Sequence, residues 1–152
     1  MGRLTVLPLV FQTATFPSPL DATASVFSFQ DSPSASTLQT VWILINSALD
    51  ARNACYIGYY QPANLLFLFP DNGDGTQATQ MPLSGNGVLE NSQCRIIASR
   101  SSRGSLENTL YVQLDIQYEN TFRGGKGIWT AASNLAGAVS PWEFVSMVLP
   151  AP

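Results

Sequence analysis

The stretch Leu110-Tyr-Val-Gln-Leu-Asp-Ile-Gln-Tyr118 has an apolar residue at every second position and mainly polar residues between them. Successive side chains of a β-strand point to opposite faces, so this period of two predicts a strand with one buried face and one face in water. The residues of the predicted buried face are Leu110, Val112, Leu114, Ile116 and Tyr118. Asp115 falls on the face that is expected to meet water.

Similar short strand patterns lie on both sides of this segment, separated by turn residues and without a long helical period. They cover residues 23–30, 38–46, 55–60, 65–69, 87–98, 128–132 and 142–149. Residues 100–104 are expected to form a polar loop. About eight to ten strands with frequent turns predict an all-β fold, an antiparallel sandwich of two sheets. We expect a single domain over residues 1–152, with residues 1–16 forming an N-terminal edge strand that Pro8 interrupts.

The composition excludes several functions. Only 11% of the 152 residues are charged, and seven basic residues stand against ten acidic ones. With no basic cluster, nucleic-acid binding is not expected. The chain has no histidine, which removes Ser-His-Asp and Cys-His catalysis and every histidine metal site.

The two cysteines, Cys55 and Cys94, suit either one disulfide or two buried thiols. Two cysteines without histidine cannot build a structural zinc site, and no cofactor is expected. No run approaches the roughly 18 consecutive apolar residues of a membrane span, so we expect no membrane insertion. The low charge favours an extracellular or cell-surface location.

Several motifs follow one another in a characteristic order: 44–49, 53–59, 65–71, 87–94, 110–118 and 122–129. The two most specific are Asn53-Ala-Cys-Tyr-Ile-Gly-Tyr59 and Leu89-Glu-Asn-Ser-Gln-Cys94. Together they resemble a module found, often in tandem, in large secreted bacterial proteins. The resemblance implies an immunoglobulin- or fibronectin-III-like sandwich with Cys55 bridged to Cys94. It also implies an accessory module without assigned catalysis, so no active-site residues are carried over.

Without histidine, the remaining candidate for catalysis is a pair of carboxylic acids of the glycosidase kind, which lie about 5–9.5 Å apart. Asp115 and Glu119 share one face of the strand, but at ~3.3 Å per residue they are about 13 Å apart. Glu143, between two aromatic residues, would need a partner from elsewhere in the chain. We therefore expect no enzyme, unless folding brings two distant acids together.

The acidic loop Asp71-Asn-Gly-Asp-Gly-Thr76 is a weak candidate for calcium binding through Asp71 and Asp74. The third and fifth positions of this loop are glycines, where a helical calcium loop needs oxygen ligands. A plain turn is the favoured interpretation, and no metal site is expected.

The aromatic residues leave two interpretations open. If Cys55 points inward, alternation places Tyr56 and Tyr60 outward. Trp42 is then either the core tryptophan packed against the disulfide, which is the favoured interpretation, or an outer partner of the two tyrosines. In the second case Trp42, Tyr56 and Tyr60 form a possible glycan-binding platform.

The sequence thus predicts a non-catalytic extracellular module that serves adhesion, spacing or assembly. A carbohydrate-binding module is the first alternative. An assembly subunit that adds a strand to a neighbour's sheet is the second. The expected partners are polysaccharides or neighbouring protein modules.

Overall fold

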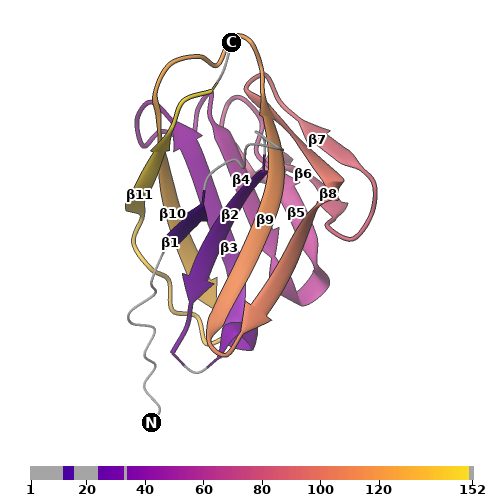
Figure 1. The fold of residues 1–152 in the computed structure, drawn as a ribbon, viewed down its shortest axis with the longest axis vertical. Helices are drawn as coiled ribbons and strands as arrows, with labels where there is room; N and C mark the ends of the chain where they lie inside the picture. Colours follow the sequence, from indigo (N-terminus) through magenta and orange to yellow (C-terminus); the bar gives the residue numbers. More distant parts are fainter. Residues whose placement is uncertain (1–11, 16–23, 33, 151–152) are drawn as a thin grey trace.

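The computed structural model of this chain describes residues 12–15, 24–32 and 34–150. They form two antiparallel sheets that face each other, so the predicted all-β sandwich is confirmed (Figure 1). The first sheet has the order β1-β2-β9-β8-β7, with β1 (Gln12–Thr15), β2 (Ala24–Gln30), β7 (Val88–Glu90), β8 (Cys94–Leu106) and β9 (Thr109–Tyr118). The second has the order β11-β10-β3-β4-β5-β6, with β3 (Leu38–Asn46), β4 (Cys55–Tyr60), β5 (Leu65–Leu68), β6 (Thr79–Pro82), β10 (Lys126–Asn134) and β11 (Glu143–Val148).

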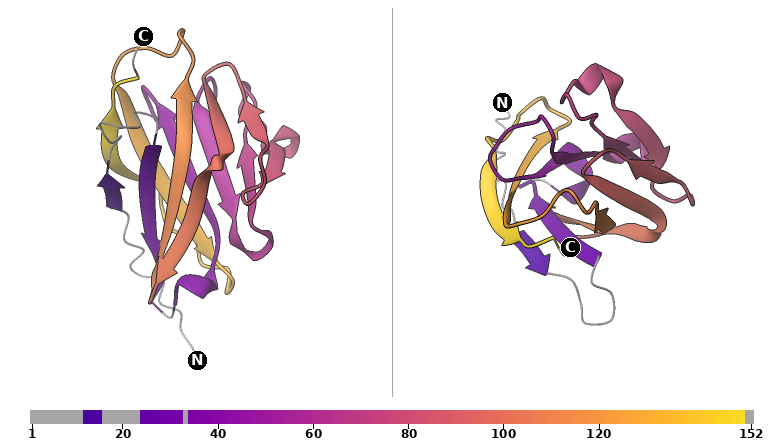
Figure 2. Two further views of the ribbon diagram at one scale, coloured as in Figure 1. Left: turned by 45° about the vertical axis from the view of Figure 1, so that its right-hand side comes forward. Right: turned by 90° about the horizontal axis from the view of Figure 1, so that it is seen from above.

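The helical content of the described residues is limited to three short 3₁₀ turns, η1 (Ala35–Thr37), η2 (Gln61–Ala63) and η3 (Gly75–Gln77). Within the same residues, no helix is long and apolar enough to cross a membrane. The view from above looks roughly along the strands, so that the two layers are seen end-on (Figure 2, right). The layers approach each other along both sides, where β1 contacts β11 and β7 contacts β5 and β6.

The core lies between the two sheets and uses the residues that the period of two selects. Leu110, Val112, Leu114 and Ile116 of β9 are all fully buried, as predicted, and Tyr118 packs against them. From the opposite sheet they meet the inward side chains of β3, β4 and β5, among them Ile43, Ile45, Ile57, Leu66 and Leu68. Burial of this apolar surface is the main force that holds the two sheets together.

The expected N-terminal edge strand is shown only in part. β1 occupies the edge of the five-stranded sheet and pairs antiparallel with β2. Residues 1–11 and residue 16 of that prediction lie outside the described residues.

The expected polar loop at residues 100–104 is wrong, because these residues continue β8. Ser102, Arg103 and Gly104 pair with β9 after an irregularity between Ile97 and Ser102. The polar side chains of this segment suggested a loop, but the hydrogen bonds that pair two strands are made by backbone groups, which do not depend on side-chain polarity. The bulge bends β8 and brings Arg100 back over the sheet.

Asp115 is the second departure, since it is fully buried on the face that was expected to meet water. Its carboxylate forms an ion pair with the guanidinium of Arg100, with 2.8 Å between Oδ2 and Nε. Neither carboxylate oxygen has a well-aligned hydrogen-bond donor in the described residues, so this contact is an ion pair rather than an aligned hydrogen bond. The bulged part of β8 therefore covers a charge that alternation assigned to water.

A buried acid also joins the sheets at one end of the sandwich. Asp31 follows β2 and is fully buried. Its Oδ2 accepts hydrogen bonds from the Thr37 hydroxyl (2.6 Å) and from the Asn134 amide (3.2 Å). Thr37 leads into β3 and Asn134 ends β10, so the contact ties the five-stranded sheet to the six-stranded one.

Candidate functional site

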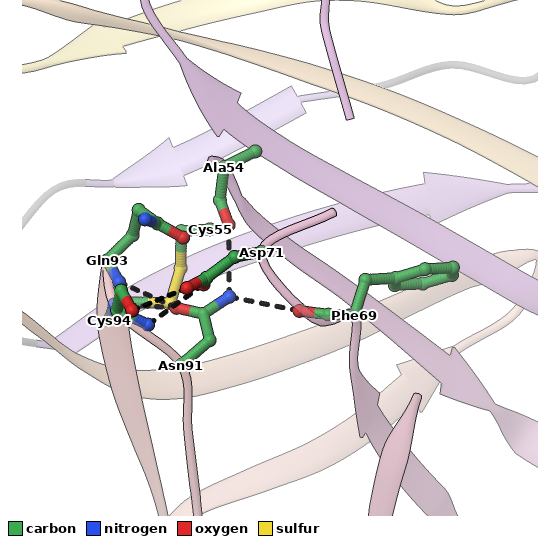
Figure 3. The surroundings of a disulfide bond; sticks show 8 residues. Ala54, Cys55, Phe69, Asp71, Asn91, Gln93 and Cys94 are labelled. Atoms are coloured by element: carbon green, nitrogen blue, oxygen red, sulfur yellow. Dashed lines mark hydrogen bonds between the residues drawn. A yellow bond between two sulfur atoms is a disulfide. The ribbon is translucent and has the colours of Figure 1, made fainter. Parts of the chain in front are cut away.

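The disulfide crosses the core between the sheets. Cys55 opens β4 in the six-stranded sheet, and Cys94 opens β8 in the five-stranded sheet. Their sulfur atoms are 2.09 Å apart, and both residues are fully buried (Figure 3). The predicted bridge is confirmed, and the alternative of two buried thiols is excluded.

Asn91 binds three separate segments beside the disulfide (Figure 3). Its amide nitrogen donates to the backbone carbonyls of Ala54 (3.1 Å) and Phe69 (3.0 Å). Its amide oxygen accepts from the backbone N–H groups of Gln93 (2.8 Å) and Cys94 (3.0 Å). One side chain thus satisfies four backbone groups where β4, β5 and β8 meet, and it holds both ends of the disulfide in place.

Asp71, one of the two calcium candidates, belongs to this same network. Its carboxylate accepts hydrogen bonds from the backbone N–H (3.1 Å) and the hydroxyl of Ser92. With its amide nitrogen turned toward this group, Gln93 donates to Asp71 Oδ1 (3.0 Å) and to the carbonyl of Ala54 (3.2 Å). Asp71 therefore anchors the turn before Cys94.

Asp74, the other calcium candidate, caps the turn η3. Its Oδ1 accepts from the backbone N–H (2.9 Å) and the hydroxyl (2.8 Å) of Thr76. These two hydrogen bonds, the side-chain one first, lower the pKa of Asp74. The two carboxylates serve different segments, and no group of three or more potential ligands occurs among the described residues. The turn interpretation therefore accounts for both acids.

A groove of about 370 Å³ lies beside this network, between Phe69–Asp71 and Glu90–Ser92. Asp71 and Asn91 line it, yet the hydrogen bonds above already occupy their polar groups. A ligand site needs polar groups that converge on open space. This groove offers few of them, so we do not assign it as the functional site.

The outer face of the six-stranded sheet carries the aromatic residues that alternation singled out. In the register, Trp42 pairs with Gly58, Tyr56 with Leu44 and Tyr60 with Thr40. The inward positions between them hold Val41, Ile43, Cys55 and Ile57, all buried in the core. Trp42 points away from the disulfide and is not part of the core cluster. The favoured interpretation of Trp42 as the core tryptophan is therefore wrong.

All three tryptophans of the chain meet on this outer surface. Trp129 of β10 pairs with Leu44 on one side and with Phe144 of β11 on the other. Trp142 reaches the ring of Tyr56 edge-on at 5.9 Å. We call the following set the aromatic face: Trp42, Tyr56, Tyr60, Phe67, Phe69, Trp129, Trp142 and Phe144. Sequence reasoning found three of its members and missed the five that other strands and the segment before β11 contribute.

Two glycines leave space over the sheet that rings of this face occupy. A Cβ atom at Gly58 would come within 2.6 Å of the Phe67 ring, and one at Gly127 within 2.7 Å of the Trp129 ring. The rings therefore spread across the backbone of the glycines instead of standing away from the sheet.

Tyr56 is less available than its neighbours. Its ring stacks on that of Phe69 with 3.8 Å between centroids and 7° between planes. Together with the Trp142 edge, this packing encloses the tyrosine, and desolvation raises the pKa of its hydroxyl. Leu44, an outward residue flanked by Tyr56 and Trp129, is only 2% exposed. Tyr56 thus helps to build a second apolar layer and is not a free stacking platform.

The outward positions that pair across the six strands carry no charged residue. Around the rings they hold Thr40, Leu65, Gln80, Pro82, Ala131, Ser133 and Met147. The outer face of the other sheet differs, because it carries Arg95 and the pair formed by Arg100 and Asp115. The outer face of the six-stranded sheet is therefore an uncharged surface, and the outer face of the five-stranded sheet carries charged residues.

Folding does bring two acids together, but not the pair considered from the sequence. Glu119 lies against Glu90 of β7. The hydrogen bond between their carboxyl groups and partial desolvation raise the pKa of Glu119, and Arg95 acts in the opposite direction.

No protein-family model and no curated protein matches this sequence.

Proposed function

We propose that this chain is a non-catalytic module of an extracellular or cell-surface protein, and that it adheres to a partner through the aromatic face. The observation that carries the proposal is the gathering of all three tryptophans on one uncharged sheet face. Aromatic residues are the side chains most enriched at binding surfaces. Asp71, Asp74 and Asp115 are engaged by neighbouring groups. Glu119 interacts with Glu90, and Glu143 is exposed on the edge strand β11.

The resemblance to modules of large secreted bacterial proteins supports the same proposal. It implies a sandwich of the immunoglobulin- or fibronectin-III-like kind. A disulfide buried in the core is typical of proteins from oxidising compartments. Such a module also acts as a spacer when it occurs in tandem.

A direct test measures adhesion of the fluorescently labelled chain to cell surfaces and to insoluble extracellular material. We expect binding that is lost in Trp42→Ala and retained in Tyr111→Ala. Tyr111 is a partly exposed aromatic residue of β9 on the outer side of the other sheet, and it serves as the matched control. Equal binding by both variants would refute the role of the aromatic face.

One further observation favours assembly as a second candidate function. β11 is an edge strand, and it and the residue that follows expose Phe144, Met147 and Leu149 by 56%, 60% and 75%. An edge strand can pair with a strand of a neighbouring molecule. Sedimentation at increasing concentration tests this function. A monomer at every concentration, unchanged by Met147→Lys, would rule it out.

A further inference from the structure

We infer that the ligand of the aromatic face is an uncharged polysaccharide, which stacks its sugar rings on Trp42 and Phe67. This inference rests on the proposed adhesive function and names the chemistry of the partner. The shape of the surface, its lack of charge and its unused hydrogen-bonding groups all favour such a ligand.

The shape comes from the row formed by Trp42, Gly58 and Phe67. These residues lie side by side on β3, β4 and β5. The Phe67 ring covers Gly58, and Trp42 Cδ1 would lie 3.5 Å from a Cβ atom there. The two rings therefore form a shallow platform that runs across three strands. Such a platform suits the flat, C–H-rich face of a pyranose ring better than a side chain that must fill a pocket.

The charge decides between neutral and acidic polymers. A polymer of uronic acids or sulfated sugars needs basic side chains to compensate its charge. The outward positions around Trp42 and Phe67 hold none. An uncharged chain would lose no ionic hydration when it settles on this surface.

Polar groups beside the platform are free to bind sugar hydroxyls. Gln80 pairs with Phe67 at one end of the row, and Thr40 and Tyr60 pair with each other in the adjacent row, beside Trp42 and Gly58. Within the described part of the chain, none of these three side chains makes a hydrogen bond to another residue. Amide and hydroxyl groups next to an aromatic ring are the kind of polar contact that fixes the orientation of a small ligand.

The platform inferred from the structure differs from the set Trp42, Tyr56 and Tyr60 that the sequence predicted, because Tyr56 is packed between other rings. Tyr56 is enclosed by Phe69 and Trp142, so Phe67 takes its place in the platform. Tyr60 contributes its hydroxyl group. The ligand-contacting residues are thus Trp42, Tyr60 and Phe67.

Affinity electrophoresis in native gels tests the inference with neutral polymers (mixed-linkage β-glucan, galactomannan, amylose) and acidic ones (polygalacturonate, alginate). We expect at least one neutral polymer to retard the chain and the acidic polymers to leave it unaffected. Trp42→Ala and Phe67→Ala should each weaken retardation at least tenfold, whereas Tyr111→Ala should not change it. Tyr60→Phe keeps the ring and the fold, and it should weaken binding severalfold.

Three outcomes would overturn the inference: retardation by the acidic polymers, equal retardation of the Trp42→Ala and wild-type chains, or retardation by none of the polymers. Thermal unfolding of each variant shows whether lost binding reflects lost folding, and Tyr60→Phe remains informative if the alanine variants do not fold. Adhesion to surfaces that persists after periodate oxidation of their glycans would mean that the partner is a protein. In that case the inference fails while the proposed adhesive function stands.

Discussion

Replacing Asn91 by alanine tests the network beside the disulfide. The side chain makes four hydrogen bonds to backbone groups, two as donor and two as acceptor. A hydrogen bond contributes about 0.5–1.5 kcal/mol net, and water can reach this half-buried site to replace part of the loss. We therefore expect the free energy of unfolding to fall by about 2–4 kcal/mol. For a chain of this size the melting temperature should fall by about 4–16 °C.

Urea unfolding followed by tryptophan fluorescence measures this change, with mass spectrometry confirming that the disulfide is intact. The midpoint should fall while the dependence on urea concentration stays the same, because the exposed surface is unchanged. Asn86→Ala, in the exposed turn before β7, is the control and should leave stability within about 0.5 kcal/mol. A loss of less than about 0.5 kcal/mol in Asn91→Ala would refute the reasoning.

The isosteric variant Asn91→Asp separates hydrogen bonding from packing. It keeps the acceptor for the two N–H groups but places a carboxylate oxygen against the carbonyls of Ala54 and Phe69. Repulsion should make it unstable at neutral pH. Part of the stability should return in acid, where the protonated group can donate one hydrogen bond. Stability that does not change with pH would show that the amide donor is unimportant.

Three other perturbations have defined outcomes. Replacing both cysteines by alanine removes a crosslink between residues that are 39 positions apart. In the chain-entropy model the free energy of unfolding, measured in urea, should fall by about 4 kcal/mol, and a loss below about 1 kcal/mol would contradict this expectation. Gly58→Ala puts a methyl carbon 2.6 Å from the Phe67 ring and should lower the free energy of unfolding, measured by thermal unfolding, by about 1–3 kcal/mol. Gly104→Ala is the control and should be neutral, because no atom lies within 4 Å of the added carbon. Equal effects of the two substitutions would disprove the contact. The raised pKa of Glu119 means that its contact with Glu90 favours the fold below the unfolded pKa and is lost as pH rises through the folded pKa. Glu90→Gln should therefore raise the melting temperature at neutral pH and flatten its pH profile above the ordinary carboxyl pKa of 4.5, and an unchanged profile would show that the two carboxyl groups do not interact.

Local pattern was sufficient where one face of a strand is simply buried. The alternation from Leu110 to Ile116 identified the core side of β9 correctly, because a shift by one residue would expose every apolar side chain. It also identified the side of the sheet on which Tyr56 and Tyr60 lie. The same parity places Trp42 outward, and only the analogy with the core tryptophan of immunoglobulin domains pointed to the interior.

Other properties of the site depend on residues far apart in the chain. Asp115 is buried because a bulge in the neighbouring strand returns Arg100 over it, and the period of two contains no information about that bulge. Asn91 follows β7, but the groups that it binds include the carbonyls of Ala54, just before β4, and Phe69, just after β5. Such contacts cannot be derived from the spacing of one segment.

The sequence by itself determined the all-β class, the sandwich and the absence of histidine chemistry, because composition and strand period act locally. Only the tertiary structure decided which aromatic residues form a surface. Trp129, Trp142 and Phe67 lie on different segments and join Trp42 through the strand order β11-β10-β3-β4-β5. That order is set by long-range pairing of the backbone, which places residues about 100 positions apart on one uncharged face.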